Sequence, residues 1–425
     1  MAGDGAGTLA SPIHLNGAPH VAAAQHGARR HRAAFMPGTA GFPHRSSGRL
    51  FDGFPAADTA SRQHQRQTDA ARYGEPLVTT PRFIRTAAAA ATLAACGAAA
   101  QAQSALTLYG ALDAGVQYLT HADGHRSAVR LQNYGILPSQ VGIKGHEDLG
   151  GGWRALFKLE QGLNLNDGTA TVPGYAFFRG AYVGIAGPVG TVTLGRQFSV
   201  LFDKTLFYDP LWYGSYSGQG VLVPMNANFI DHSVKYQSPT FAGFDVEALA
   251  ATAGVAGNTR AGRVLELGGQ YTSNGLSVGA VLHQAHGDVS AADDASARRR
   301  ELGTLAARYA FATLPLTVYA GVERLTGDLD AARTIVWGGA RYLTSNGIGL
   351  NAGVYHTDSH TPTIGHPTLF IASTTYALSK RTVAYVNLGY ARNSGQSSQT
   401  VYEYDPTPLA GASQFGAMVG MYHLF

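Results

Sequence analysis

The last residues of the chain, 414–425, carry apolar or aromatic side chains at every second position and end on an aromatic residue. Phe415, Val419 and Phe425 share one face of this pattern. A period of two is that of a β-strand, and an apolar face alternating with small residues suits a strand between lipid and a lumen. A membrane barrel must pair its last strand with its first, because lipid tolerates no open edge. The pattern predicts a transmembrane β-barrel, with Phe425 as its assembly signal.

The same alternation recurs along the chain in segments separated by turn residues. These segments lie near residues 104–118, 139–147, 153–163, 176–186, 191–198, 231–238, 243–252, 263–272, 275–285, 300–310, 315–325, 333–343, 347–356, 367–377, 381–391 and 413–425. They number sixteen, the even count expected of a bacterial outer-membrane barrel. The predicted fold is all-β: a 16-stranded antiparallel transmembrane β-barrel.

The connectors alternate between short turns and longer polar links, as expected of periplasmic turns and outer loops. Two short turns contain Asn-Gly, at Asn274 and Asn346, which favours tight hairpins. The longest connector, 200–228, is aromatic and compact, unlike a solvated loop. We expect this third long loop to fold into the barrel.

Composition agrees with a lipid-facing barrel. Charged residues make up 14% of the chain, well below the roughly 25% of soluble domains, while Gly and Tyr are abundant. Beyond Ala102 there is no uninterrupted apolar run of eighteen residues, so a helical span is excluded. A soluble β-sandwich and a plugged barrel are the alternatives. A soluble β-sandwich fits poorly with an export signal. A plugged barrel usually carries a long extra domain, and residues 103–425 have no room for one.

The net charge of +4 comes from the N-terminal region, where residues 1–102 hold ten Arg and no Lys against five acids. The remainder is nearly neutral, so we expect no nucleic-acid partner. Arg82 and Arg85 precede a small apolar stretch and an Ala-Gln-Ala cleavage site ending at Ala102, the order of a secretory signal. A lipoprotein signal with Cys96 as the acylated residue is the alternative.

These observations divide the chain into three parts. Residues 1–77 form a low-complexity extension, which we interpret as an overlong gene start, with Val78 as the initiator. A disordered extension is the other reading. Residues 78–102 are the predicted signal peptide and 103–425 the predicted barrel.

Strand alternation also predicts which charges face the lumen. Trp153, Ala155, Phe157 and Leu159 would form the lipid face of their strand. That places Arg154, Lys158 and Glu160 on the lumen wall, and the same parity places Lys144 inside. A charge facing lipid near the midplane would cost roughly 2–4 kcal/mol. A position at a membrane rim is the alternative for each of these charges.

Six ordered motifs carry a resemblance to a known family. They are Thr107-Leu-Tyr-Gly-Ala-Leu-Asp-Ala-Gly, Val141-Gly-Ile-Lys-Gly-His-Glu-Asp-Leu-Gly-Gly-Gly, Phe178-Arg-Gly-Ala-Tyr-Val-Gly-Ile, Gly190-Thr-Val-Thr-Leu-Gly-Arg-Gln, Ser233-Val-Lys-Tyr-Gln-Ser-Pro and His423-Leu-Phe. From about Ser104 to the C-terminus the chain resembles the Gram-negative general porins. The resemblance implies an outer-membrane homotrimer that passes small hydrophilic solutes and ions by diffusion. Outer-membrane lipid and the barrel-assembly machinery would be its other partners.

The resemblance also implies a pore constriction. Arg196, Lys144 and Arg179 match basic positions of the family's motifs, and we expect them to oppose Asp203 and Asp209 across the pore. Strict alternation would point Arg196 outward, so a bulge is required. The family commonly has a basic residue before the Ser233 motif, where this chain has Asp231 nearby, and this weakens the case for strong anion selectivity.

Two other functions would require specific sequence features. An outer-membrane hydrolase would need a nucleophile, a base and an orienting group within reach, and neither G-x-S-x-G nor H-E-x-x-H spacing occurs. We therefore expect no enzymatic activity, no cofactor and no metal. A substrate-selective channel would need a specific lumen surface, for which Tyr208, Trp212 and Tyr213 are candidates.

Overall fold

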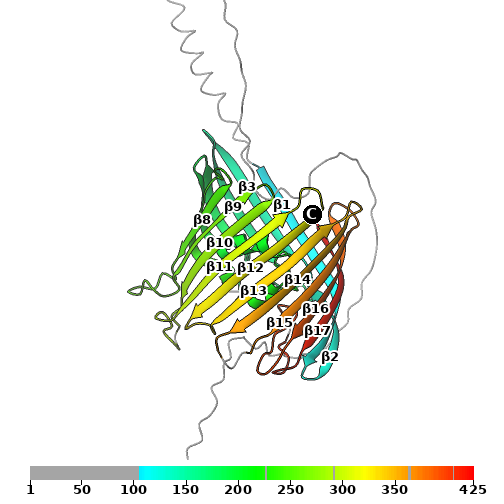
Figure 1. The fold of residues 1–425 in the computed structure, drawn as a ribbon. Coiled ribbons are helices and arrows are strands. Elements are labelled where there is room, and N and C mark those ends of the chain that lie inside the picture. The colour runs from blue at the N-terminus through cyan, green and yellow to red at the C-terminus, as the bar shows by residue number, and fades with distance from the viewer. Residues whose placement is uncertain (1–104, 225–226, 291, 362–364, 405) are drawn as a thin grey trace, which may run out of the picture. The chain divides into compact units, whose positions relative to one another are not determined.

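A computed structural model describes residues 105–224, 227–290, 292–361, 365–404 and 406–425. The expected signal peptide, Cys96 and the N-terminal extension lie outside these residues. The described strands form one antiparallel sheet that closes on itself, because β1 pairs with β17 from Ala111↔Leu424 to Leu119↔Gly416 (Figure 1). No described helix is both long and apolar enough to cross a membrane.

The strands follow the predicted segments closely, within one to four residues at most ends. In chain order they are β1 (Ala105–Asp123), β2 (Arg126–Asn133), β3 (Gln140–Gly150), β4 (Trp153–Gly162), β5 (Gly180–Gly187), β6 (Gly190–Phe198), β7 (Phe229–Gln237), β8 (Phe244–Ala251), β9 (Val264–Ser273), β10 (Leu276–His286), β11 (Arg299–Ala310), β12 (Leu316–Gly327), β13 (Arg333–Leu343), β14 (Ile348–Ser359), β15 (Thr368–Ala377), β16 (Thr382–Arg392) and β17 (Gln414–Leu424).

These seventeen strands occupy sixteen positions in the barrel wall, as predicted. One edge of β1 pairs with β2 along Ala114–Asp123 and with β3 along Ala105–Ala111. β2 and β3 are therefore two halves of one barrel strand, interrupted by residues 134–139. β2 was not predicted, although its exposed Val129 and Leu131 alternate with the less exposed Arg130 and Gln132.

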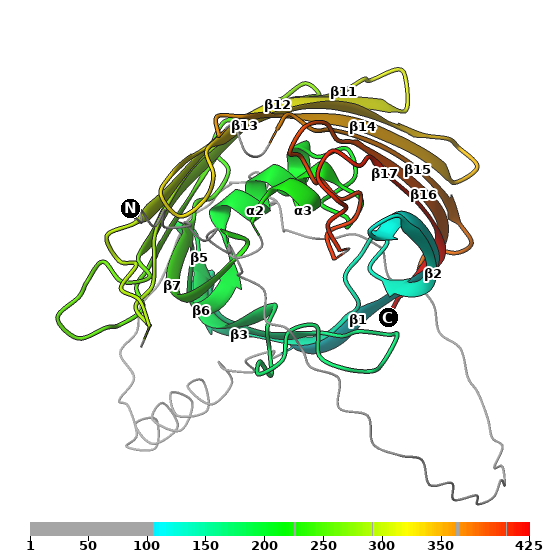
Figure 2. The same ribbon diagram turned by 90° about the horizontal axis from the view of Figure 1, so that it is seen from below.

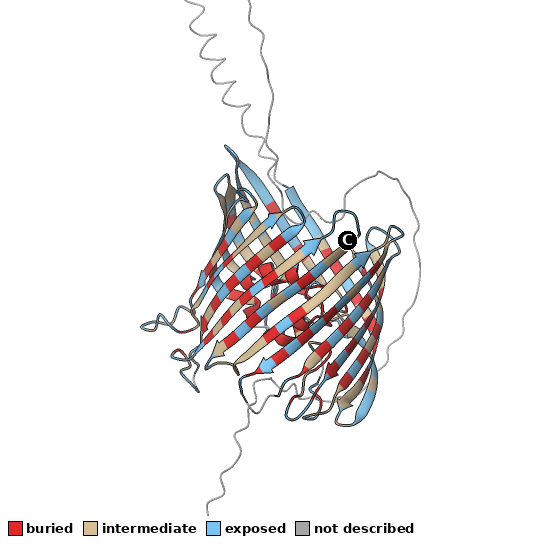
Figure 3. Ribbon diagram, in the orientation of Figure 1, coloured by how far each residue is buried: buried red, intermediate tan, exposed pale blue. Residues whose placement is uncertain are grey.

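Burial alternates along the strands, with one residue buried and the next exposed (Figure 3). On β1, for example, Leu106, Leu108 and Val116 are exposed, whereas Asp113 and Gln117 are fully buried. A barrel in lipid has this pattern, with apolar side chains facing out and polar side chains facing in.

The inner loop, residues 199–224 and 227–228, lies within the ring of strands (Figure 2). It contains α2 (Val200–Thr205), a 3₁₀ turn, η1 (Leu206–Tyr208), and α3 (Gly218–Leu222). The hydroxyls of Ser199 and Ser217 accept hydrogen bonds from the first turns of α2 and α3, and so cap both helices. The buried apolar core lies between this loop and the inner face of the wall.

Candidate permeation site

Asp209 holds the inner loop in its conformation through hydrogen bonds. Its carboxylate accepts hydrogen bonds from the backbone N–H of Leu211 (3.3 Å) and Tyr213 (2.6 Å), and from the hydroxyls of Ser217 and Tyr355. Burial raises the pKa of Asp209, while the Ser217 and Tyr355 hydroxyls lower it. We expected Asp209 to face the basic wall. It instead lies fully buried inside the loop, because these four donors hold it there.

The base of the inner loop is held to the barrel wall by charged side chains. Glu266 of β9 accepts the Val200 N–H (2.7 Å) and contacts His283 Nδ1 of β10 (2.7 Å). Lys204 of α2 forms ion pairs with Asp245 and, at 2.9 Å, with Glu247 on β8. The start of the loop is therefore attached to two neighbouring strands, β8 and β9.

A basic cavity lies on the lumen wall beside the inner loop. Its volume is about 580 Å³, and its lining includes Lys144, Arg154, Lys158, Asp203 and Lys235. Lys144 and Lys158 are opposite each other on β3 and β4. Lys235 of β7 forms an ion pair with Asp203. The structure thus brings together four of the residues selected from the sequence. Lys235 was missed, although it alternates with the outward Val234 and Tyr236.

Glu160 is the buried acid of this wall. Its carboxylate accepts a hydrogen bond from the Tyr109 hydroxyl (2.6 Å) and forms ion pairs with Lys158 (3.0 Å) and Arg179 (3.1 Å). The Arg179 guanidinium also lies over the Phe198 ring, with its carbon 5.3 Å from the ring centre. Lys158, Glu160 and Arg179 therefore form one ion-pair cluster beside the inner loop.

Arg196 does not meet the acids of the inner loop. The register between β6 and β7 shifts at Arg196, so the expected bulge exists. In register, however, Arg196 is opposite Ala181, in the outward-facing row. Its guanidinium bonds to Asp231 (2.5 Å) and packs on the Phe178 ring at 4.5 Å. The ion pair with Asp231 and the aromatic contact explain why it turns away from Asp203.

Two arginines on the opposite wall were not selected from the sequence. Arg308 of β11 lies over the Phe207 ring at 5.2 Å, and Arg341 of β13 lies over the Trp212 ring at 3.3 Å. Both contact the tip of the inner loop. The alternation of inward and outward positions along β11 and β13 could have identified Arg308 and Arg341, because both alternate with exposed neighbours.

Asp113 was also missed. The carboxylate is fully buried and accepts the backbone N–H groups of Gly135 (3.1 Å), Ile136 (2.8 Å) and Leu137 (2.8 Å), as well as the Tyr385 hydroxyl (2.6 Å). It thereby fixes the segment 134–139 that interrupts the barrel strand. No local sequence signal could reveal this, because the partners lie 22 to 272 residues away.

A second cavity, of about 530 Å³, lies between the inner loop and the connectors 163–179 and 393–404. Its lining includes Arg179, Tyr213, Glu403 and Tyr404. Burial raises the pKa of Glu403 to about 8, against smaller opposing effects of a Tyr404 hydrogen bond and the Arg179 charge.

Phe425 closes the barrel at its terminus. Its backbone N–H and C=O exchange hydrogen bonds of 3.1 Å with Gly110. A Cβ at position 110 would meet the Phe425 ring at 2.2 Å, so only glycine fits there. The role of Phe425 as an assembly signal remains a prediction.

Comparison with known proteins adds family evidence. Residues 86–396 match the family model described as "Gram-negative porin". Outer membrane porin protein 32 of Delftia acidovorans is 30% identical over 79% of this chain and 98% of its own length. An outer membrane porin protein of Bordetella pertussis is 33% identical over 38% of this chain and 46% of its own length.

Solved structures agree with these matches. A structure titled "Anion-selective porin from Comamonas acidovorans" covers 76% of this chain and all of its own, with a TM-score of 0.67 and 26% identity. The trimer form of OmpT of Vibrio cholerae covers 76% of this chain and 99% of its own, with a TM-score of 0.55 and 15% identity, and supports the fold.

Proposed function

Because this chain belongs to the Gram-negative porin family and is an outer-membrane protein, we propose that it is a general diffusion channel. In this proposal small hydrophilic solutes and ions cross through the lumen beside the inner loop, and the protein is a channel rather than an enzyme. It works as a homotrimer in outer-membrane lipid, assembled by the barrel-assembly machinery.

The observation that carries the proposal is the basic cavity on the lumen wall. It joins charged side chains from β3, β4 and β7 with Asp203 of the inner loop. Fixed charges at the narrow part of a channel replace part of the hydration of a polar solute and exclude apolar ones. The buried hydrogen bonds of Asp209 hold the inner loop in place beside this cavity.

An anion-selective channel is the second candidate, and a specific charge distribution favours it. Lys144 and Arg154 are exposed in the cavity, and neither forms an ion pair with another described residue. The acids beside them, Asp203 and Glu160, are both neutralised by ion pairs. The accessible charge of this wall is therefore positive, and the acidic Asp231 of β7 is paired with Arg196.

Reconstituted protein tests both candidates. In planar bilayers we expect stepwise conductance, and in liposomes we expect uptake of neutral sugars that falls smoothly as their size increases. Reversal potentials in a KCl gradient then measure ion preference. Conductance that saturates with one solute at low concentration would identify a substrate-selective channel instead, and absence of conductance from correctly folded protein would refute the proposal.

A further inference from the structure

Aromatic side chains gather at the base of the inner loop. This aromatic cluster consists of Phe178, Phe198, Phe202, Tyr213 and Phe229. The Phe198 and Phe202 rings stack at 4.3 Å, and the Phe229 ring lies 4.8 Å from Phe198. These three rings are only half-buried, and Phe202 and Phe229 line the second cavity, of about 530 Å³. Half-buried rings beside a passage for hydrophilic solutes offer a surface for a flat apolar group.

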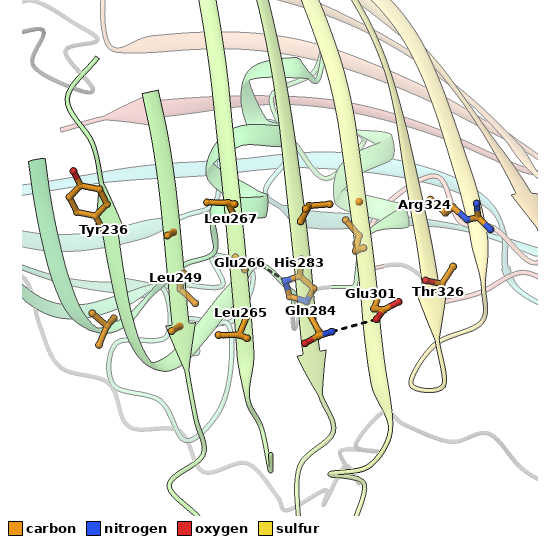
Figure 4. Close-up of a pocket in the computed structure, with 16 residues that line it drawn as sticks. Tyr236, Leu249, Leu265, Glu266, Leu267, His283, Gln284, Glu301, Arg324 and Thr326 are labelled. Carbon is orange, nitrogen blue, oxygen red and sulfur yellow. Dashed lines mark hydrogen bonds and ion pairs between the residues drawn. The ribbon is translucent and has the colours of Figure 1, made fainter. Parts of the chain in front are cut away.

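Hydrogen bonds hold the Phe202 ring in a fixed position. Phe202 lies in α2, whose first N–H group, that of Val200, donates to the Glu266 carboxylate at 2.7 Å. Glu266 in turn contacts His283 on the neighbouring strand at 2.7 Å (Figure 4). The backbone N–H of Phe202 itself donates to the Ser199 hydroxyl at 2.9 Å. The ring surface is therefore formed before a ligand arrives, which lowers the entropic cost of binding.

Unused hydrogen-bond donors lie beside these rings. The Arg179 guanidinium carbon is 5.7 Å from the Phe229 ring centre, and its Nε donates to Glu160 at 3.1 Å. Its two terminal nitrogens form no hydrogen bond with a described residue. Asn228 is 3% exposed, and its Oδ1 accepts the Tyr213 hydroxyl at 2.9 Å. Its Nδ2 has no partner among the described residues, and both side chains line the cavity.

The other polar groups of this cavity favour an anion over a neutral solute. Four asparagines on the lining have a side-chain oxygen that already accepts a hydrogen bond: Asn133, Asn164, Asn166 and Asn228. Arg179 and Lys158 share one acid, Glu160, so their ion-pair cluster has a surplus positive charge. Burial raises the pKa of Glu403 to about 8, so at pH 7 this carboxyl is mostly protonated and does not repel an anion.

We propose that this cavity binds small aromatic carboxylates as they pass through the lumen. The ring of the solute lies against Phe202 and Phe229. Its carboxylate accepts hydrogen bonds from Arg179 and Asn228. Aromatic rings pack favourably offset or edge to face, and a guanidinium binds a carboxylate through paired hydrogen bonds. The cavity volume is within the range of small-molecule sites, and binding is weak, since a permeating solute must also leave.

Ligand-observed NMR of the folded protein in detergent at pH 7 tests the class of solute. Benzoate is titrated beside cyclohexanecarboxylate, which has the charge without the aromatic ring, and benzamide, which has the ring without the charge. We expect benzoate to bind at least fivefold more tightly than either. Equal binding of benzoate and one of the other two would overturn the proposal. The comparison uses the wild-type protein, so it decides the question even if a variant fails to fold.

Variants test the location of the site. Phe202→Leu keeps an apolar side chain but removes the ring, and benzoate binding should weaken at least fivefold. Phe207→Leu makes the same change on an inner-loop ring that does not line the cavity, and binding should stay within twofold of wild type. Arg179→Gln should abolish the preference for benzoate over benzamide, whereas Arg298→Gln, on an exposed connector, should keep it. Equal effects within either pair would refute the site.

The proposed site rests on the diffusion-channel function, because it names a class of solute that this passage favours. Conductance in KCl without benzoate is therefore measured on the same preparations in planar bilayers. A conducting protein without a preference for benzoate would refute the site and leave the channel function in place. A folded protein that binds benzoate but does not conduct would confirm the site and refute the channel function.

Discussion

Glu403 shows how burial gives one residue a distinct property. Its carboxyl lies in the cavity above the inner loop, and burial raises its pKa to about 8 from an ordinary value of 4.5. The folded protein thus holds this proton more tightly than the unfolded chain. The contribution to stability is complete below about pH 4.5 and is lost as the pH rises through 8.

We therefore expect the connector 393–404 to loosen between pH 6 and pH 9. Hydrogen exchange of its amides, corrected for intrinsic rates, should increase over this range by about tenfold or less. Glu403→Gln should remove the increase, because the amide cannot ionise. Glu147→Gln, on an exposed carboxyl, serves as the control. An unchanged pH response in Glu403→Gln would assign the loosening to another group.

At the scale of elements, the interruption between β2 and β3 depends on one carboxylate. Asp113 satisfies three consecutive backbone N–H groups of segment 134–139, and the Asn387 amide donates to the Gly135 carbonyl at 2.8 Å. This segment also contacts the inner loop, since the Tyr134 hydroxyl donates to the Tyr213 carbonyl at 3.1 Å. Wall and inner loop are therefore coupled through Asp113.

Removing this carboxylate should destabilise both elements. Asp113→Ala leaves buried donors without an acceptor, and we expect a loss of about 2–4 kcal/mol. Asp113→Asn should be nearly as harmful, because its amide NH₂ would face N–H donors. The measurement is the midpoint of heat-induced unfolding on gels, together with open-channel noise. Asp167→Ala, at an exposed turn, should leave the unfolding midpoint close to that of the wild type. A normal midpoint in both Asp113 variants would contradict this account.

At the scale of the whole molecule, the lumen charges act together. Lys144 and Arg154 on one wall and Arg308 and Arg341 on the other line the passage around the inner loop, while most lumen acids are buried or paired. Their summed field should attract anions, most strongly in dilute salt, where the Debye length is about 30 Å at 0.01 M.

The double variant K144A/R154A should therefore lower the anion-to-cation permeability ratio by about twofold or more at low salt. The effect should shrink in 1 M KCl, where screening is strong. Arg196→Ala is a useful comparison, because its charge is paired with Asp231 outside the basic cavity, and its effect on selectivity should be small. A larger change in selectivity with Arg196→Ala than with the double variant would show that Arg196, rather than Lys144 and Arg154, sets the ion preference.

Sixteen barrel strands and the side of the wall that most of their residues face could be predicted from the alternation of the sequence alone, although β2 was not. Alternation is a local property with a period of two, so Lys144, Lys158 and Glu160 could be placed without knowing any distant contact. The positions of Asp209, Arg196 and Asp113 depend on contacts between distant parts of the chain. Asp209 meets Tyr355 across 146 residues, and Asp113 meets Tyr385 across 272. Such contacts form only when the barrel closes. Each carboxylate then loses its hydrogen bonds to water, and the donors from distant parts of the chain must replace them.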